Sequence, residues 1–86
     1  MTTANITVRY FASIREALGT GSEALATQAA TLGALRDELI ARGGAHADAL
    51  ARGQAVRVAL DQTLCSEDTA LADRAEVAFF PPVTGG

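Results

Sequence analysis

Residues 31–42 read TLGALRDELIAR and carry the clearest helical period in the chain. Large aliphatic residues recur there at intervals of three, four and one positions, and they are Leu32, Leu35, Leu39 and Ile40. This spacing places them on one face of an amphipathic helix, with Thr31 as a suitable N-cap. Gly43-Gly44 follows and is expected to end the helix. We therefore predict one long helix near residues 31–42, with its apolar face against a sheet.

The other side of this helix is polar. Arg36, Asp37, Glu38 and Arg42 are expected to point away from the core, and Glu38 and Arg42 have the i, i+4 spacing of a favourable ion pair. This distribution is typical of a helix that covers a core with one face only.

Two shorter helical segments are expected beside the long one. The first follows a capping-box pattern over Ser13 to Glu16, and Gly19 is its expected stop. The second is an alanine-rich helical turn over residues 45–53, which contains His46.

The first strand is expected at residues 5–11, where apolar and polar residues alternate. Ile6, Val8 and Tyr10 share one face of it, so Phe11 falls on the opposite, wetter face. We expect the first face to pack against the helix.

Further strands are expected at residues 56–60, 63–65 and 76–80, where alternation or short apolar runs recur. Residues 23–29 are ambiguous, because alanine favours helix whereas the flanking turns favour strand, and we assign them as strand. The polar segment 66–74, which holds Leu71, connects the last two strands. Strands packed on one amphipathic helix make an α+β domain with a mixed sheet.

The composition limits the function. The 86 residues carry a net charge of −3, and their seven basic residues are scattered arginines, so nucleic-acid binding is not supported. Cys65 stands alone, which excludes an internal disulfide and a site of several cysteine ligands. The N-terminal residues lack the pattern of a secretion signal, and no apolar run approaches the length of a membrane span. A cytoplasmic domain without a membrane partner is expected.

Individual polar residues give little sign of catalysis. Cys65 has no basic neighbour in sequence that would activate it, so a structural role is expected. His46 has no metal-ligand partner at a useful spacing and is interpreted as a surface residue. Asp68, Asp73 and Glu76 form no recognisable acid–base pair and are interpreted as a solvated rim. No metal site is predicted.

Residues 81–86 follow the last strand as a separate tail to the domain of residues 1–80. Pro81-Pro82 cannot continue a ladder of hydrogen bonds and makes the exit from the sheet semi-rigid. Gly85 and Gly86 have no Cβ, so a carboxylate at Gly86 could enter a channel too narrow for side chains. A Gly-Gly end is also found as a tag remnant or a frayed terminus.

An apolar patch is expected where the tail begins. If the first and last strands are neighbours, Phe11 and Phe80 both face away from the helix, which suggests a docking surface. The alternative is that they are singly exposed apolar residues, which are normal on soluble proteins.

The run EVAFFPPVTGG at residues 76–86 closely resembles the C-terminus of the molybdopterin synthase small subunit, a family of ubiquitin-like β-grasp sulfur carriers. The segments VRYFA at residues 8–12 with Arg15-Glu16, and LDQTL at residues 60–64, resemble it too. Asp61, where many members have asparagine, and Arg74-Ala75, in place of a glycine-containing turn, depart from the family pattern. The resemblance spans nearly the whole chain and implies a β-grasp fold.

The resemblance also implies a chemical cycle. The carboxylate of Gly86 would be adenylated with ATP by a ubiquitin-activating-type adenylyltransferase and converted to a thiocarboxylate by a persulfide sulfur donor. The thiocarboxylate would then give its sulfur to cyclic pyranopterin monophosphate in the large catalytic subunit, within a heterotetramer. The chain itself would be a non-catalytic sulfur-donating subunit without a bound cofactor. The residues implied are Pro81, Pro82, Val83, Thr84 and Gly85 in the partner's channel, and Phe11, Leu64 and Phe80 at the interface.

The sequence is also compatible with three other functions. They are a sulfur carrier for another thiocarboxylate pathway such as thiamine synthesis, a protein-tagging modifier joined through Gly86, and an interaction module whose tail is inert. The chain has no lysine, which excludes lysine-linked chains of itself but not single tagging.

Overall fold

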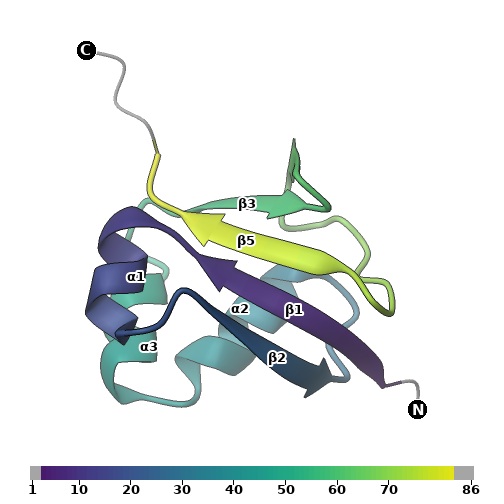
Figure 1. Ribbon diagram of the computed structural model, residues 1–86, viewed down its shortest axis with the longest axis horizontal. Helices are drawn as coiled ribbons and strands as arrows, with labels where there is room; N and C mark the ends of the chain where they lie inside the picture. The colour runs from purple at the N-terminus through teal and green to yellow at the C-terminus, as the bar shows by residue number, and fades with distance from the viewer. Residues whose placement is uncertain (1–2, 83–86) are drawn as a thin grey trace.

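The computed structural model describes residues 3–82, which form a five-stranded mixed sheet with helices packed against it (Figure 1). The strand order is β2-β1-β5-β3-β4, and the central pair β1 and β5 is parallel while its neighbours are antiparallel. The strands are β1 (Ala4–Tyr10), β2 (Ser22–Thr27), β3 (Arg57–Leu60), β4 (Thr63–Cys65) and β5 (Glu76–Phe80). The predicted pairing of the first and last strands is confirmed.

Three helices pack against the sheet, where the sequence predicts one long and two shorter helical segments, but the helix predicted to be long is itself short. The three helices are α1 (Ala12–Leu18), α2 (Leu32–Ile40) and α3 (Gly44–Leu50). The longest, α2, has nine residues and begins after Thr31, whose hydroxyl accepts a hydrogen bond from the backbone N–H of Ala34 at 3.1 Å. The helical segment therefore ends before Arg42, and α3 starts directly after the predicted stop at Gly43.

The core lies between the inner face of the sheet and the helices. Leu32, Leu35 and Leu39 are fully buried, as the leucine period predicts. From the sheet side the core takes alternate residues, which are Ile6, Val8 and Tyr10 of β1, Val58 of β3, and Val77 and Phe79 of β5. The strand assignment of residues 23–29 is confirmed by β2, although only Thr27 among its residues is fully buried.

Arg36 does not face water, so that prediction is wrong. It is only 4% exposed, and its guanidinium donates hydrogen bonds to the backbone carbonyls of Leu50, Ala51 and Gln54 and to the carboxylate of Glu67. Three of these acceptors belong to the end of α3 and the loop after it, and Glu67 belongs to the connection between β4 and β5. The arginine satisfies polar groups that would otherwise be buried without partners.

The predicted ion pair between Glu38 and Arg42 is also absent. Glu38 accepts a hydrogen bond from the hydroxyl of Thr27, and Arg42 pairs with Glu23, so both side chains reach across to β2. Glu38 and Arg42 therefore interact with residues of β2 and not with each other across one helical turn.

The predicted capping box at Ser13 is not formed either. Helix α1 begins at Ala12, its N-cap is Phe11, and no side chain caps it. The predicted stop is confirmed, since Gly19 ends the helix in the left-handed conformation with φ of 74°.

Candidate functional site

The outer face of the sheet, opposite the helices, carries a row of four residues that is small and apolar at its centre. Arg9, Ala78, Ala59 and Leu64 stand directly opposite one another across β1, β5, β3 and β4. Directly opposed residues point to the same face of a sheet. The two alanines at the centre form the floor of a depression, and larger side chains at the ends of the row and beside it form its walls.

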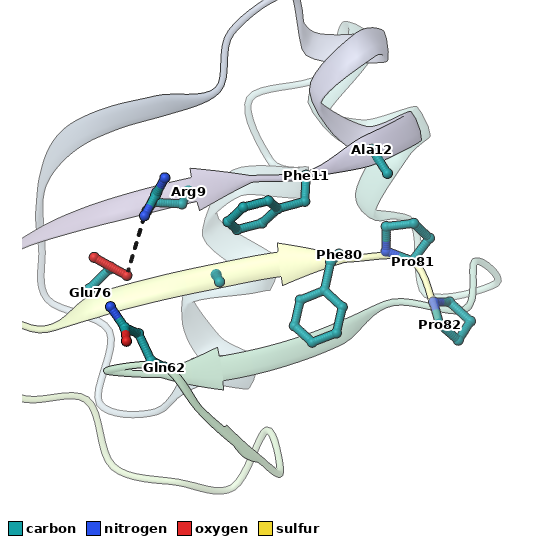
Figure 2. Close-up of a pocket in the computed structure, with 9 residues that line it drawn as sticks. Arg9, Phe11, Ala12, Gln62, Glu76, Phe80, Pro81 and Pro82 are labelled. Carbon is teal, nitrogen blue, oxygen red and sulfur yellow. Dashed lines mark ion pairs between the residues drawn. The ribbon is translucent and has the colours of Figure 1, made fainter. Parts of the chain in front are cut away.

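A groove of about 770 Å³ runs over this face. Its lining comes from β1, the start of α1, β5 with the two prolines after it, and the β3–β4 turn. It consists of Arg9, Phe11, Ala12, Gln62, Glu76, Ala78, Phe80, Pro81 and Pro82. Figure 2 shows the rings of Phe11 and Phe80 on the same side of the sheet, with Pro81 and Pro82 continuing from the end of β5. The groove is therefore mainly apolar and is continuous with the first two residues of the tail.

The predicted exposed residues lie on this face. Phe11 is 39% exposed and Leu64 is 59% exposed, and they are the large hydrophobic residues that stand out as exposed in residues 3–82. Phe80 is half-buried because neighbouring strands flank it, whereas the adjacent Phe79 is fully buried in the core. Their role in contacting a partner stays a prediction.

A charged pair closes one side of the groove. The guanidinium of Arg9 lies 3.8 Å from the carboxylate of Glu76 and 5.3 Å from the ring centre of Phe11 (Figure 2). Stacking of a guanidinium over an aromatic ring is favourable and holds the ring in place. The sequence analysis interpreted Glu76 as part of a solvated rim and gave Arg9 no role, so it missed their pairing, although their position on the outward face of β1 and β5 follows from strand alternation.

The β3–β4 turn presents Gln62 at the far end of the groove. Asp61 and Gln62 both have positive φ, of 48° and 71°, which is the conformation of the tight turns that join hairpin strands. The carboxylate of Asp61 accepts a hydrogen bond from the backbone N–H of Glu76 at 2.9 Å, and its own N–H donates to the carbonyl of Glu76 at 2.8 Å. Asp61 thus connects the hairpin to β5.

A second polar cluster lies at the opposite edge of the sheet. Glu23 of β2 accepts hydrogen bonds from Tyr10 at 2.9 Å and Arg42 at 2.8 Å, and His46 lies 3.5 Å from it and packs edge-on against Tyr10. Burial raises the pKa of the Tyr10 hydroxyl, and its hydrogen bond to Glu23 raises it further. Burial alone would raise the pKa of Glu23, but the hydrogen bonds from Arg42 and Tyr10 and the charge of Arg42 outweigh it, so this pKa is lowered.

His46, interpreted from the sequence as a surface residue, is half-buried at the surface and belongs to a hydrogen-bonded cluster. In residues 3–82 no three His, Cys, Asp or Glu side chains gather as a metal site would require. Cys65 is partly buried against the core, in keeping with the structural role expected for it. Within the described part of the chain no helix has the length and apolar character to cross a bilayer.

The tail is only partly described. Pro81 and Pro82 are half-buried at the end of the groove, whereas the predicted tail residues Val83, Thr84 and Gly85 and the predicted reactive residue Gly86 lie outside the described residues. The structure thus locates the base of the tail, beside Phe80, and the apolar groove that leads to it.

Comparison with known proteins identifies the family. The ThiS family model matches residues 8–86. The molybdopterin synthase sulfur carrier subunit of Escherichia coli is 46% identical over 81 residues, which cover 94% of this chain and 99% of that protein.

Solved structures agree on the fold. SAMP1 from Haloferax volcanii superposes with a TM-score of 0.74 at 27% identity, over 96% of this chain and all of that one. A complex of subunits 1 and 2 of the molybdopterin-converting factor from Helicobacter pylori matches with a TM-score of 0.61 at 27% identity, over 95% of this chain and 99% of the matched chain. With its ubiquitin-like β-grasp fold, this chain belongs to the ThiS family and groups with the molybdopterin synthase sulfur carrier subunits.

Proposed function

We propose that this chain is the sulfur carrier subunit of a molybdopterin synthase, and that it delivers sulfur as a thiocarboxylate on Gly86. The observation that carries the proposal is the apolar groove on the outer sheet face, which runs without a break into Pro81 and Pro82 at the base of the tail. A partner that covers the groove would receive the tail at the same time. The relationship to the E. coli carrier subunit supports this assignment.

The chemistry requires activation of the carboxylate by another protein. A free α-carboxylate has a pKa of about 3.3–3.7, so it is ionised at neutral pH and is a poor electrophile. Reaction with ATP on an adenylyltransferase forms an acyl-adenylate and releases pyrophosphate. A persulfide sulfur then attacks the acyl carbon, AMP leaves, and reductive cleavage of the resulting acyl disulfide by a thiol frees the thiocarboxylate. In the large subunit, two such carriers supply the two sulfur atoms of the dithiolene.

The groove is the proposed docking surface for the large catalytic subunit. Phe11, Phe80 and Leu64 provide exposed apolar area on a rigid sheet, and aromatic residues in such positions are frequent binding hot spots. None of the side chains of residues 3–82 forms an acid–base pair beside the groove that would suit catalysis by this chain alone, because the Arg9–Glu76 pair is a cation with its counter-ion. The catalytic groups are therefore assigned to the partner.

Protein tagging is a second candidate, favoured by the similarity to the small archaeal modifier SAMP1 of H. volcanii. Both functions would use the same activated glycine, and they differ in the acceptor. A carrier gives its sulfur to a small molecule and is released with a carboxylate, whereas a modifier stays attached to a target amine.

Reconstitution tests the proposal. The chain is incubated with ATP, an adenylyltransferase of the same host and a persulfide donor, and its intact mass is followed. We expect a mass increase equal to the difference between sulfur and oxygen, and we expect the loaded chain to convert cyclic pyranopterin monophosphate when the large subunit is added.

The matched control is a chain without Gly86. Loss of one residue withdraws the carboxylate by about 3.5 Å, and transfer tolerates a misplacement of only about 1 Å before the rate falls roughly a hundredfold. Chemically thiocarboxylated shortened chain should therefore bind the large subunit and transfer little sulfur. Normal transfer by the shortened chain, or stable conjugates to other proteins in place of product, would contradict the carrier assignment.

A further inference from the structure

The charges on the outer sheet face are unevenly distributed along the groove. Arg9 and Glu76 face each other at 3.8 Å and largely compensate one another. Arg57, at the start of β3, is exposed and forms no ion pair with any residue between 3 and 82. The surface beside the end of the groove from which the tail leaves thus carries a positive charge, although the chain as a whole has a net charge of −3.

Arg57 lies next to the aromatic part of the groove, although it is not one of the residues that line it. It stands directly opposite Phe80 in the antiparallel β3–β5 pair, so both side chains project from the outer face. Phe80 is followed at once by Pro81 and Pro82. A partner that covers Phe80 and follows the tail must therefore pass over or beside the guanidinium of Arg57.

The carboxylates nearest along these strands are too far away to neutralise it. Asp61, directly after β3, and Glu76, at the start of β5, each lie four residues from the Arg57–Phe80 pair, a separation of about 13 Å at 3.3 Å per residue. Charges at the surface that are separated by more than about 10 Å are largely screened at 0.1 M salt. A docked partner that offered only apolar surface would leave Arg57 partly desolvated without a counter-charge, which is unfavourable.

We propose that Arg57 makes the docking surface selective for a partner that places a carboxylate beside an apolar centre. The inference rests on the proposed function for the identity of that partner, the large synthase subunit, and adds the chemistry of its contact surface. Phe11 and Phe80 supply the apolar contact, and Arg57 determines the register and the rate of association. Electrostatic complementarity at the rim of an interface acts mainly on association rate and specificity.

Binding kinetics of charge variants test this inference. Association with the large subunit of the same host is measured by surface plasmon resonance at low and at moderate salt, for wild type, Arg57→Gln and Arg57→Glu. From the usual strength of exposed ion pairs, we expect affinity at low salt to fall about threefold in Arg57→Gln and about tenfold in Arg57→Glu. Most of the loss should be in the association rate, and added salt should reduce the difference.

The matched control is Arg74→Glu. It makes the same change in net charge at a side chain that is 92% exposed and lies just before β5, at the opposite end of that strand from Phe80. At moderate salt it should leave affinity within about twofold of wild type, since surface charges more than about 10 Å apart are then largely screened, and at low salt it should lower affinity less than Arg57→Glu does.

Each outcome has a defined meaning. Equal effects of Arg57→Glu and Arg74→Glu, or tighter binding by Arg57→Glu, would overturn the selectivity inference and leave the carrier function standing. Failure of the wild-type chain to bind the large subunit at all would overturn both. A partial rescue of Arg57→Glu by reversing one acidic residue of the large subunit would identify the counter-charge.

Discussion

The guanidinium of Arg36 is almost completely buried, and its hydrogen bonds connect α2 to the last residue of α3 and to two loops. Its Nε donates to the carbonyl of Leu50 at 2.8 Å, and its terminal nitrogens donate to the carbonyls of Ala51 and Gln54 and to Glu67. Since the carbonyls cannot move to water while α3 stays packed, Arg36 stabilises the whole connection from α3 to β3. Arg36→Leu removes the donors and leaves the acceptors buried.

We expect Arg36→Leu to lower the free energy of unfolding by about 2–4 kcal/mol, as is usual when one partner of a buried charged network is removed. Urea unfolding followed by circular dichroism measures this change. Arg42→Leu serves as the control, because that side chain is 36% exposed and its ion pair with Glu23 should contribute less than about 1 kcal/mol. Similar losses of unfolding free energy in both variants would show that the buried Arg36 network contributes no more to stability than an exposed ion pair.

The backbone at Arg74 is strained. Its φ is 66°, in the left-handed region, and its N–H donates to the carbonyl of Asn5 at 2.7 Å, so the turn before β5 depends on this conformation. A residue with a Cβ loses about 1–2 kcal/mol there, and glycine loses about 0.5–1 kcal/mol of chain entropy.

Arg74→Gly should therefore raise the free energy of unfolding by up to about 1 kcal/mol, visible as a higher urea midpoint. Arg74→Ala keeps the Cβ and loses the same guanidinium, so it separates relief of backbone strain from loss of the contact with Asp73. If both variants gain equally, the side chain and not the backbone is the source of the effect.

At the scale of elements, the period of apolar residues predicted the fold because it reports burial directly. Leucine spacing located α2, and alternation located β1, β3 and β5 with the correct inward residues. The same reasoning put Phe11 and Phe80 on the outer face. Alternation along a strand shows which residues share a face, and it does so without any knowledge of the neighbouring strands.

Polar contacts could not be predicted in this way. Glu38 and Arg42 were expected to pair with each other, but Thr27 and Glu23 of β2 come close only after the sheet has packed on the helix. Arg36 was expected to face water for the same reason, since its acceptors are carbonyls of a loop that the sequence pattern does not place. The Arg9–Glu76 pair beside the groove depends on the parallel pairing of β1 and β5.

The two consecutive phenylalanines of β5 give a matched test of the groove. Phe80→Asp should leave the chain folded and weaken binding to the large subunit by at least about 2 kcal/mol, the usual size of a hot spot. Phe79 is fully buried, and Phe79→Ala should lower the free energy of unfolding by about 3–5 kcal/mol. Circular dichroism and a binding titration separate the two effects. Unchanged affinity in Phe80→Asp, or unfolding of that variant, would count against the docking surface.

For the molecule as a whole, two carboxylates connect stability to pH. Glu67 receives hydrogen bonds from Arg36 and Arg52, and Glu23 receives them from Tyr10 and Arg42. Burial by itself raises the pKa of Glu67, but the hydrogen bonds from Arg52 and Arg36 and their charges outweigh it, so the pKa lies below its ordinary value. Glu23 follows the same balance. Each group thus binds its proton more weakly in the folded chain than in the unfolded chain.

The sign of the pH effect follows from this difference. A carboxyl with a lowered folded pKa contributes stability at pH values above its unfolded pKa, and the contribution is lost as the pH falls through that value toward the folded one. We therefore expect the free energy of unfolding to be nearly constant from pH 7 to 5.5 and to fall below about pH 4.5, the ordinary value for glutamate.

Glu67→Gln isolates one of the two contributions. It should be less stable than wild type at pH 7, because Arg36 and Arg52 lose a charged acceptor, and it should lose less stability between pH 5.5 and 3.5, because one titrating group is gone. Urea unfolding at a series of pH values measures both. The control is Ala17→Gly in α1, which touches no carboxylate network and lowers helix stability by about 1 kcal/mol, so its curve should run parallel to that of wild type. If the stability of Glu67→Gln also fell with pH in parallel to that of wild type, the titration of Glu67 would not be the cause of the acid-induced loss of stability. Glu23 would then make the larger contribution to it.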